Sequence, residues 1–294
     1  SAGSALELVG CSCAGNEATG NGGALRSNGS LTVEDGIFDA NQCGNIGGAI
    51  YASDGDLTIR STVFSDNQNP NRGGAVIASV PTQISDATFT GNQSIEGGAL
   101  YFSGANLTLA RIHFDDNQAE RGGGLFARCY DTAPCDPVQI ADTTFSNNRA
   151  VSAVSGSGGG LEALNVDLEV SSSTFSGNQT SGAGGGLYLA GATRARLVNL
   201  TIAANTAAAG GGVSSSSSLI VREIANDIVA GNGPDDCDRS LGVAGAHNAS
   251  SDASCGFAGS GDLESVDPRL AALADAGGPA PDHALLPGSP AIDA

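Results

Sequence analysis

Acidic side chains are the residues of this sequence that could carry chemistry, because they recur at equivalent places in a repeat. Asp66 and Asp116 each come directly before a recurring Asn, two repeats apart, and Asp115 adjoins the second of them. Hydrolysis of a glycosidic bond needs two carboxyl groups about 5–9.5 Å apart beside a sugar-sized groove. Parallel stacking of the repeats would place Asp66 and Asp116 roughly 9.6 Å apart. They are therefore the candidate carboxyl pair of a glycoside hydrolase.

A second set of charged residues suggests lyase chemistry. A polysaccharide lyase needs carboxylates that bridge Ca²⁺ and an Arg or Lys that acts as base. Residues of these types lie on neighbouring repeats, namely Asp86, Arg111, Asp115, Asp116 and Asp142. Sugar clefts are usually lined by aromatic side chains, however, and this chain has no Trp and 4 Tyr. We therefore favour solvated carboxylates on a polar face, and predict no catalytic, cofactor-binding or metal-binding residue.

Other catalytic signatures are missing from the sequence. The 3 histidines, His113, His247 and His283, accompany no Gly-x-Ser-x-Gly motif on a strand-to-helix turn. The Gly-rich run at residues 156–160 is not followed by the Gly-Lys-Ser/Thr of a phosphate-binding loop. The sequence thus favours a non-catalytic protein, with a carbohydrate-active enzyme or carbohydrate-binding module that uses the lateral Asp-rich face as the alternative.

The positions of these residues are set by a repeat of about 25 residues, which reads Phe-x-x-Asn, a short gap, and Gly-Gly-Ala-aliphatic. Asn16, Asn205 and Asn232 extend the Asn positions beyond the copies that have Phe, giving about nine coils. A fixed period of this length is typical of a solenoid. The predicted structural residues are Phe38, Asn41, Phe64, Asn67, Phe89, Asn92, Phe114, Asn117, Phe145, Asn148, Phe175 and Asn178.

Strands, not helices, are expected within each coil. Aliphatic residues alternate before each Phe, as Leu31 and Val33 do before Phe38, and this is the period of a strand. We predict an all-β fold, a right-handed parallel β-helix of about nine coils over residues 1–232, with an irregular C-terminal cap over residues 233–294. Phe would fill the core, Asn would stack at a turn in a left-handed backbone, and Gly-Gly would permit the bend.

Three further features concern surfaces. Arg111 falls between Asp86 and Asp142 in adjacent coils, which predicts a ladder of charges. The coils between Asn117 and Asn178 are longer than the others, and their insertions should form lateral loops of the kind that often carry function. The first coil, at residues 6–8, would present unpaired strand edges, so end-to-end stacking into a homo-oligomer or filament is expected of this end.

Charge and cysteine content place the chain outside the cell. A net charge of −19 with no Lys repels nucleic acid and anionic lipid, and no run of 18 apolar residues would span a membrane. A chain that opens within a repeat and has no Met reads as a processed segment. Two disulfides are predicted across loops, and one more pair among Cys11, Cys13 and Cys43, which favours an oxidising compartment. The two loop disulfides would join Cys129 to Cys135 and Cys237 to Cys255.

The paired Phe-x-x-Asn and Gly-Gly-Ala-aliphatic motifs resemble the polymorphic outer-membrane protein repeats of bacterial surface proteins. The tail, with Asp267-Pro268, Gly277-Gly278-Pro279 and Ser289-Pro290-Ala291-Ile292-Asp293, is similar to the choice-of-anchor region of secreted bacterial β-helix proteins. This resemblance implies a secreted or cell-surface structural or adhesive module that binds a host or polysaccharide surface. The sequence lacks the C-terminal barrel of the autotransporter plan.

Overall fold

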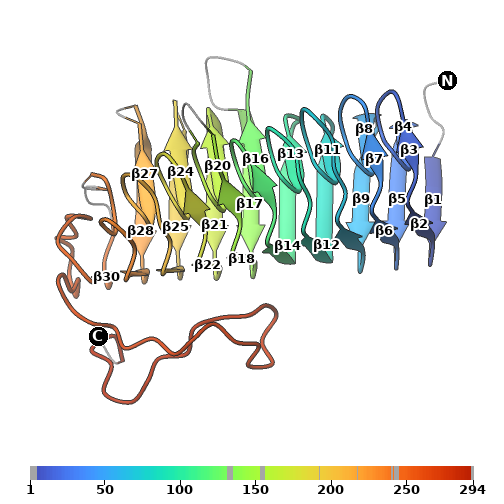
Figure 1. Cartoon of the computed structure of the whole chain (residues 1–294). Helices are drawn as coiled ribbons and strands as arrows, with labels where there is room; N and C mark the ends of the chain where they lie inside the picture. Colours follow the sequence, from blue (N-terminus) through green and yellow to red (C-terminus); the bar gives the residue numbers. More distant parts are fainter. Residues whose placement is uncertain are drawn as a thin grey trace.

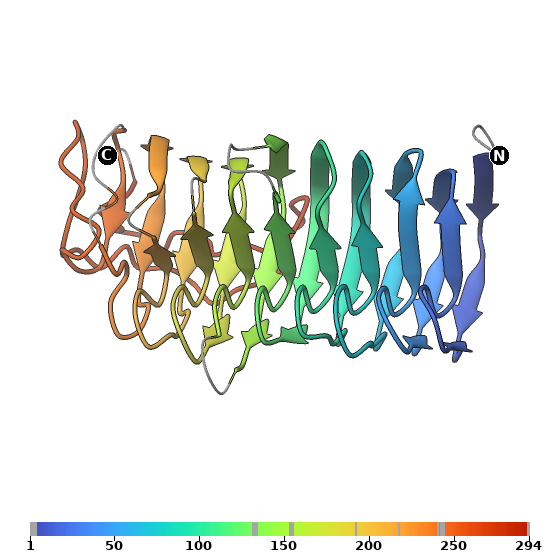
Figure 2. The same cartoon turned by 90° about the horizontal axis from the view of Figure 1, so that it is seen from above.

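The computed structural model describes residues 5–130, 135–152, 156–191, 193–216, 218–239, 241 and 245–292, without the side chains of residues 135 and 136. The chain winds into coils that stack in sequence order along a rod (Figures 1 and 2). The named strands pair in parallel, and the described residues include no helix. The predicted all-β parallel β-helix is therefore confirmed.

One wall of the rod is a 17-stranded sheet that contains two rows of strands. The first row comprises β1 (Ala5–Val9), β5 (Ser30–Glu34), β9 (Leu57–Arg60), β12 (Thr82–Thr90), β14 (Leu107–Asp115), β17 (Cys135–Ala141), β21 (Val166–Ser171), β25 (Arg194–Val198) and β28 (Ile220–Ala225). The second row, which carries the Phe positions, continues through β12 and β14 and otherwise comprises β2 (Ser12–Ala14), β6 (Ile37–Asp39), β10 (Val63–Ser65), β18 (Thr144–Ser146), β22 (Thr174–Ser176), β26 (Thr201–Ala203), β29 (Ile228–Ala230) and β30 (Ala249–Ser250).

The segments that follow Gly-Gly form a separate 8-stranded sheet, which supplies one strand for each of eight coils. Its strands are β4 (Leu25–Asn28), β8 (Ile50–Asp54), β11 (Val76–Ala78), β13 (Leu100–Phe102), β16 (Leu125–Arg128), β20 (Leu161–Leu164), β24 (Leu187–Ala190) and β27 (Val213–Ser215). Two-residue strands complete some coils, namely β3 (Glu17–Ala18), β7 (Gln42–Cys43), β15 (Gln118–Ala119), β19 (Arg149–Ala150) and β23 (Gln179–Thr180).

The core between the sheets is built from stacked identical side chains. The six phenylalanines of the repeat are fully buried, and neighbouring rings lie face to face with centroids 4.7 to 5.1 Å apart. Since parallel in-register strands repeat about every 4.8 Å, one ring per coil stacks on the next without a gap. The register that pairs each Phe with the next is therefore fixed by the core itself.

The recurring asparagines form a second internal ladder. The side-chain amide of Asn67 donates to Oδ1 of Asn92 at 3.0 Å and to the Phe38 carbonyl at 2.9 Å, and other coils repeat this pattern. The predicted left-handed backbone at Asn is wrong, because the residue before each Asn takes that conformation, as at Asp66 with φ 52° and Asp116 with φ 51°. The buried Asn must keep its hydrogen bonds, so its exposed neighbour makes the turn.

Each glycine of the Gly-Gly pair has its own function. Gly73 has a φ of 62°, the left-handed region that favours glycine. A Cβ on Gly74 would lie 1.9 Å from the carbonyl oxygen of Gly98, so the second position must lack a side chain for the coils to approach. The pair therefore both turns the chain and lets neighbouring backbones touch.

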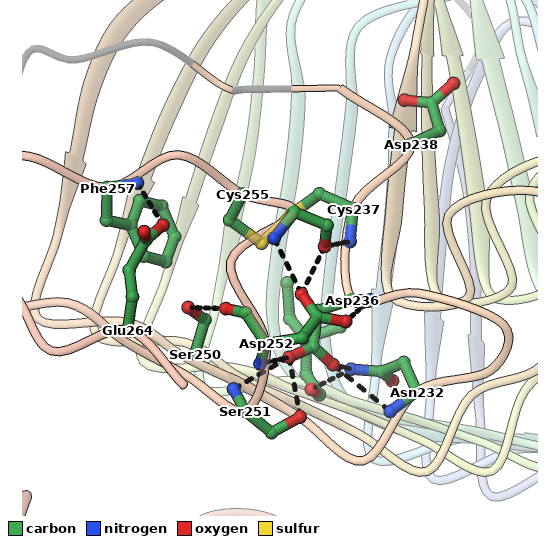
Figure 3. The surroundings of a disulfide bond; sticks show 12 residues. Asn232, Asp236, Cys237, Asp238, Ser250, Ser251, Asp252, Cys255, Phe257 and Glu264 are labelled. Carbon is green, nitrogen blue, oxygen red and sulfur yellow. Dashed lines mark hydrogen bonds between the residues drawn. A yellow bond between two sulfur atoms is a disulfide. The ribbon is translucent and has the colours of Figure 1, made fainter. Parts of the chain in front are cut away.

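The coil pattern continues past Asn232, where the sequence predicted the cap to begin. β30 pairs in parallel with β29, and Ala249 is bridged in parallel to Leu263. Cys237 and Cys255 form a disulfide at this end, with Asp236 beside it (Figure 3). The predicted capping segment thus begins with further coil-like structure.

The rest of the predicted cap lies along the side of the rod. From about residue 264 the chain runs back beneath the 17-stranded sheet (Figure 1). Antiparallel bridges from Leu270 to Leu285 and from Ala274 to Asp282 make it a hairpin. The Thr144 hydroxyl donates to the Pro281 carbonyl at 2.6 Å and so holds this hairpin against β18.

The predicted disulfide among Cys11, Cys13 and Cys43 is absent, because all three are free thiols. Cys13 occupies the Phe position of the first coil, whereas Cys43 lies in β7, which belongs to a different sheet. The thiols of Cys11 and Cys13 are neighbours, and burial raises the pKa of Cys11. The predicted bond between Cys129 and Cys135 falls outside the described residues, because the Cys135 side chain is not described.

Candidate functional site

The carboxylates predicted as a glycosidase pair stand at the corners of two coils. Asp66 and Asp116 are both exposed, on the left-handed turn that precedes each ladder Asn, with a whole coil between them. The lyase set is likewise spread over separate corners. Arg111 pairs in a bidentate manner with Asp86, at 2.6 and 2.8 Å, and this hydrogen bonding holds the pKa of Asp86 below its usual range. Asp142 adds only a weaker attraction to Arg111.

Three polar residues on β14 and β18 lie in contact, but their hydrogen bonds do not connect them in the order of a Ser-His-Asp triad. The Ser146 hydroxyl donates to Asp115 at 2.6 Å, and His113 Nε2 lies 2.9 Å from the same hydroxyl oxygen. A serine triad requires the His to accept the Ser proton and the Asp to orient the His. Here the Ser146 hydroxyl donates its hydrogen bond to the Asp115 carboxylate instead of to His113, so these residues do not form that site. His113 is half-buried, and burial lowers its pKa.

A different face of the rod gathers all 4 tyrosines of the chain. Tyr51, Tyr101, Phe126 and Tyr188 occupy the same outward position of β8, β13, β16 and β24, in one row along the axis. Tyr130 follows the end of β16 and joins them, since its hydroxyl lies 2.8 Å from that of Tyr101. We call these five residues the aromatic face.

By number the tyrosines are sparse, but Tyr51, Tyr101 and Tyr188 share one position of the repeat with Phe126. The signal that could have found them is their place in the repeat, directly after the buried aliphatic residue that follows Gly-Gly or Gly-Gly-Ala. Other coils place Ile77 and Glu162 in this row, so the row is not uniform. The folding motif therefore does not account for these aromatic residues, since it tolerates other types at the same position.

The centre of the aromatic face is a small hydrophobic cluster outside the main core. Ile77, Tyr101 and Phe126 are at most 3 % exposed although they point away from the interior of the rod. Arginine side chains cover them instead of another layer of structure. Arg72 lies over the Tyr101 ring at 5.2 Å and Arg121 over the Phe126 ring at 4.7 Å, a distance suited to cation–π attraction.

Two glutamates pair with the covering arginines. Arg72 Nε lies 2.7 Å from Glu96, and Arg121 bridges Glu96 at 3.7 Å and Glu162. Glu162 is fully buried and also accepts from the Ser157 hydroxyl at 2.5 Å. Burial raises the pKa of Glu162, opposed by its bonds to Arg121. A carboxylate so enclosed and so fully paired holds the arginine in place and has no open side for a substrate.

The rim of this face offers rings and guanidinium groups to solvent. Tyr130 is 60 % exposed, and Tyr51 and Tyr188 are half-buried. Arg128 lies over the Tyr130 ring at 4.3 Å, and Arg26 lies over the Tyr51 ring at 5.6 Å. Tyr130 belongs to the insertion of the first long coil, so this predicted lateral loop does contribute to the face.

A shallow groove of about 430 Å³ runs beside the aromatic face. Its lining combines apolar side chains with amides and one ion pair, namely Asn45, Ile46, Asn71, Arg72, Ile95 and Glu96. Flat rings, hydrogen-bonding groups and a groove on a rigid sheet are features of a site that binds a ligand along its length. The arrangement can therefore stack and hydrogen-bond an extended polar molecule.

The part of the chain that the structure describes contains no helix long and apolar enough to cross a membrane. A family model described as a right handed beta helix region matches residues 44–207, which is more than half of the chain. No curated protein and no solved structure matches it. The matched residues include the third to the eighth Asn of the ladder and the whole aromatic face. The chain belongs to the family of right-handed β-helix proteins.

Proposed function

We propose that the chain is a non-catalytic, glycan-binding rod of a secreted or cell-surface protein. The observation that carries this proposal is that all 4 tyrosines lie on one face, three of them in a row along the rod and Tyr130 beside that row. It keeps the surface module that the sequence suggested and moves its binding site from the Asp-rich corners to the aromatic face.

A sugar chain suits this face for a physical reason. An aromatic ring offers a flat apolar surface to the carbon-bound hydrogens of a sugar ring, while its hydroxyl can pair with sugar hydroxyls. The half-buried rings of Tyr51 and Tyr188 lie in strands β8 and β24, at opposite ends of the row. An extended polymer can contact both ends of such a row, whereas a small molecule cannot.

The stiffness of the rod supports a role in presenting this face. Stacked phenylalanines and the asparagine ladder join each coil to the next, so the rows of side chains keep their spacing. A preorganised row loses little conformational entropy when it binds a polymer. The proposal does not include filaments, because Asp236 and the Cys237–Cys255 disulfide occupy the C-terminal end that head-to-tail stacking would need.

Binding to a panel of soluble polysaccharides, measured with the full chain by affinity electrophoresis, tests the proposal. Replacing Tyr51 and Tyr188 together by Ala should weaken binding at least about tenfold, because two stacking surfaces are lost. The matched control replaces Asp66 and Asp116 by Asn on the corner face, and should bind as the wild type does. The proposal fails if the wild type binds no polysaccharide, or if the Asp variant loses binding while the Tyr variant keeps it.

A further inference from the structure

We infer that the glycan bound by the aromatic face is anionic, and that the guanidinium group of Arg128 binds its carboxylate or sulfate. This inference rests on the proposed glycan binding and adds the chemical class of the ligand. The evidence is an excess of positive charge at one place in a strongly acidic chain, together with a half-buried arginine that has no acidic partner among the described residues.

The charge of the aromatic face is opposite to that of the chain. The chain has 31 acidic and 12 basic residues, all Arg, for a net charge of −19. Four of these arginines lie over rings of the aromatic face, namely Arg26, Arg72, Arg121 and Arg128. The carboxylates that pair with any of the four are Glu96 and Glu162. Cations therefore outnumber their acidic partners here, which raises the local affinity for anions.

Arg26 and Arg128 are the two of these four arginines without an acidic partner among the described residues; Arg26 is exposed and donates to Asn28, whereas Arg128 is half-buried. Arg72 and Arg121 share the two glutamates, but Arg128 has no ion pair among the residues that the structure describes. Its contacts are with rings, at 4.3 Å to Tyr130 and 5.9 Å to Phe126. Its Nε is buried and has no hydrogen-bond partner in the described part of the chain. A half-buried guanidinium group without an anion is costly unless a ligand supplies one.

The neighbouring ring is fixed in position for the same ligand. The Tyr130 hydroxyl is bonded to that of Tyr101 at 2.8 Å and accepts from Arg72 at 3.3 Å, while 60 % of the residue stays exposed. A sugar ring that stacks on Tyr130 would bring its substituents beside Arg128. A guanidinium fork pairs with a carboxylate or sulfate through two parallel hydrogen bonds, which a neutral hydroxyl cannot match.

Polygalacturonate and its fully methyl-esterified form make the sharpest pair of probes, because the two polymers share a backbone and differ in charge. Binding of the full chain should be at least about tenfold weaker for the ester, which is the change that a charged hydrogen bond produces. Dextran sulfate and dextran form a second pair that distinguishes sulfate from carboxylate. Equal binding of charged and neutral members of both pairs would overturn the inference and leave glycan binding intact.

Substitutions assign the effect to Arg128. Arg128→Gln removes the charge at similar length and should lower affinity for the anionic probe about tenfold, with little change for the neutral one. Arg128→Lys keeps the charge without the fork and should recover part of the loss. The control is Arg60→Gln, an exposed arginine at the end of β9 on the 17-stranded sheet. Unchanged binding by a folded Arg128→Gln variant would contradict the assignment. A wild type that binds none of the polysaccharides would contradict both proposals.

Discussion

Asp236 Oδ1 accepts the side-chain amide of Asn232 at 2.9 Å, so the asparagine ladder ends on a carboxylate (Figure 3). In the coils before it each Asn amide donates to the next Asn toward the C-terminus. All these dipoles therefore point the same way, and a negative charge lies where the last donors point. The other carboxylate oxygen accepts from the Ser251 amide at 2.8 Å and from its hydroxyl at 2.7 Å.

Replacing Asp236 by Asn should destabilise the C-terminal end. One oxygen could still accept from Asn232, but an amide NH₂ would then face the Ser251 donors, which lose their acceptor. A buried donor left unpaired costs about 1–3 kcal/mol. The melting temperature should fall measurably for Asp236→Asn and stay near the wild-type value for the exposed Asp66→Asn. Equal melting temperatures for the two variants would show that the carboxylate at the ladder's end has no stabilising role.

An alanine in the middle of the ladder should be more damaging. Asn117 accepts from the backbone and side chain of Asn92 at 3.0 and 2.9 Å, and donates to Phe89 O at 2.9 Å and to Asn148. Asn117→Ala leaves the buried backbone amide of Asn92 without its side-chain acceptor and removes one partner each from the Asn92 side chain, Phe89 O and Asn148, at a cost of about 2–4 kcal/mol. The free energy of unfolding of the variant and of the wild type, measured by denaturant unfolding, gives this cost.

The control for this variant is Asn45→Ala, which removes an exposed hydrogen bond to Asn21. It should change the free energy of unfolding by less than about 1 kcal/mol. If the two alanine variants unfolded at the same denaturant concentration, the buried ladder would contribute no more than a surface contact.

The core of this fold could be predicted from the sequence because folding demands the same residue in every coil. Stacking requires Phe89 to lie between Phe64 and Phe114, so the requirement appears as a repeat. The disulfide between Cys237 and Cys255 could also be predicted, since these two residues bracket one loop. The sequence predicts the left-handed turn one residue too late, because the repeat shows which residue is constant and not which one has a positive φ.

The aromatic face could not be predicted from that repeat because its outward row mixes residue types. Tyr51 and Ile77 are neighbours in the row, and Glu162 takes the same position farther along. The position of the C-terminal hairpin along the side of the rod could not be predicted from the sequence either. Its contacts, such as His283 with Ser176 at 2.8 Å, join parts of the chain that share no periodicity.

Asp227 should make stability fall as pH rises toward the alkaline range. It is 1 % exposed, its Oδ2 has no partner among the described residues, and burial raises its pKa from 3.8 to about 8. Between these two values the folded protein binds the proton more tightly than the unfolded chain does, so this group's contribution is present in full at low pH and is lost as pH rises through about 8.

Asp227→Asn tests this assignment, because its amide oxygen can still accept from the Leu200 amide, as Asp227 does at 2.7 Å. The variant should lose part of the fall in melting temperature between pH 5 and pH 9 that the wild type shows. Parallel pH profiles for wild type and Asp227→Asn would contradict the role of Asp227.

Removal of residues 264–294 should leave the rod folded. Between residues 264 and 292 only Pro268 and Ser289 are buried, so the hairpin adds little apolar burial to the solenoid. It is held through few side-chain bonds, among them those of Thr144 and Ser176. The disulfide, in contrast, ties together the last coil-like segment, and disulfide loss typically costs about 2–5 kcal/mol. Truncation should therefore lower the melting temperature less than replacement of Cys237 and Cys255 by Ser. The reverse order would mean that the hairpin, and not the disulfide-linked segment, is the cap that protects the last coil.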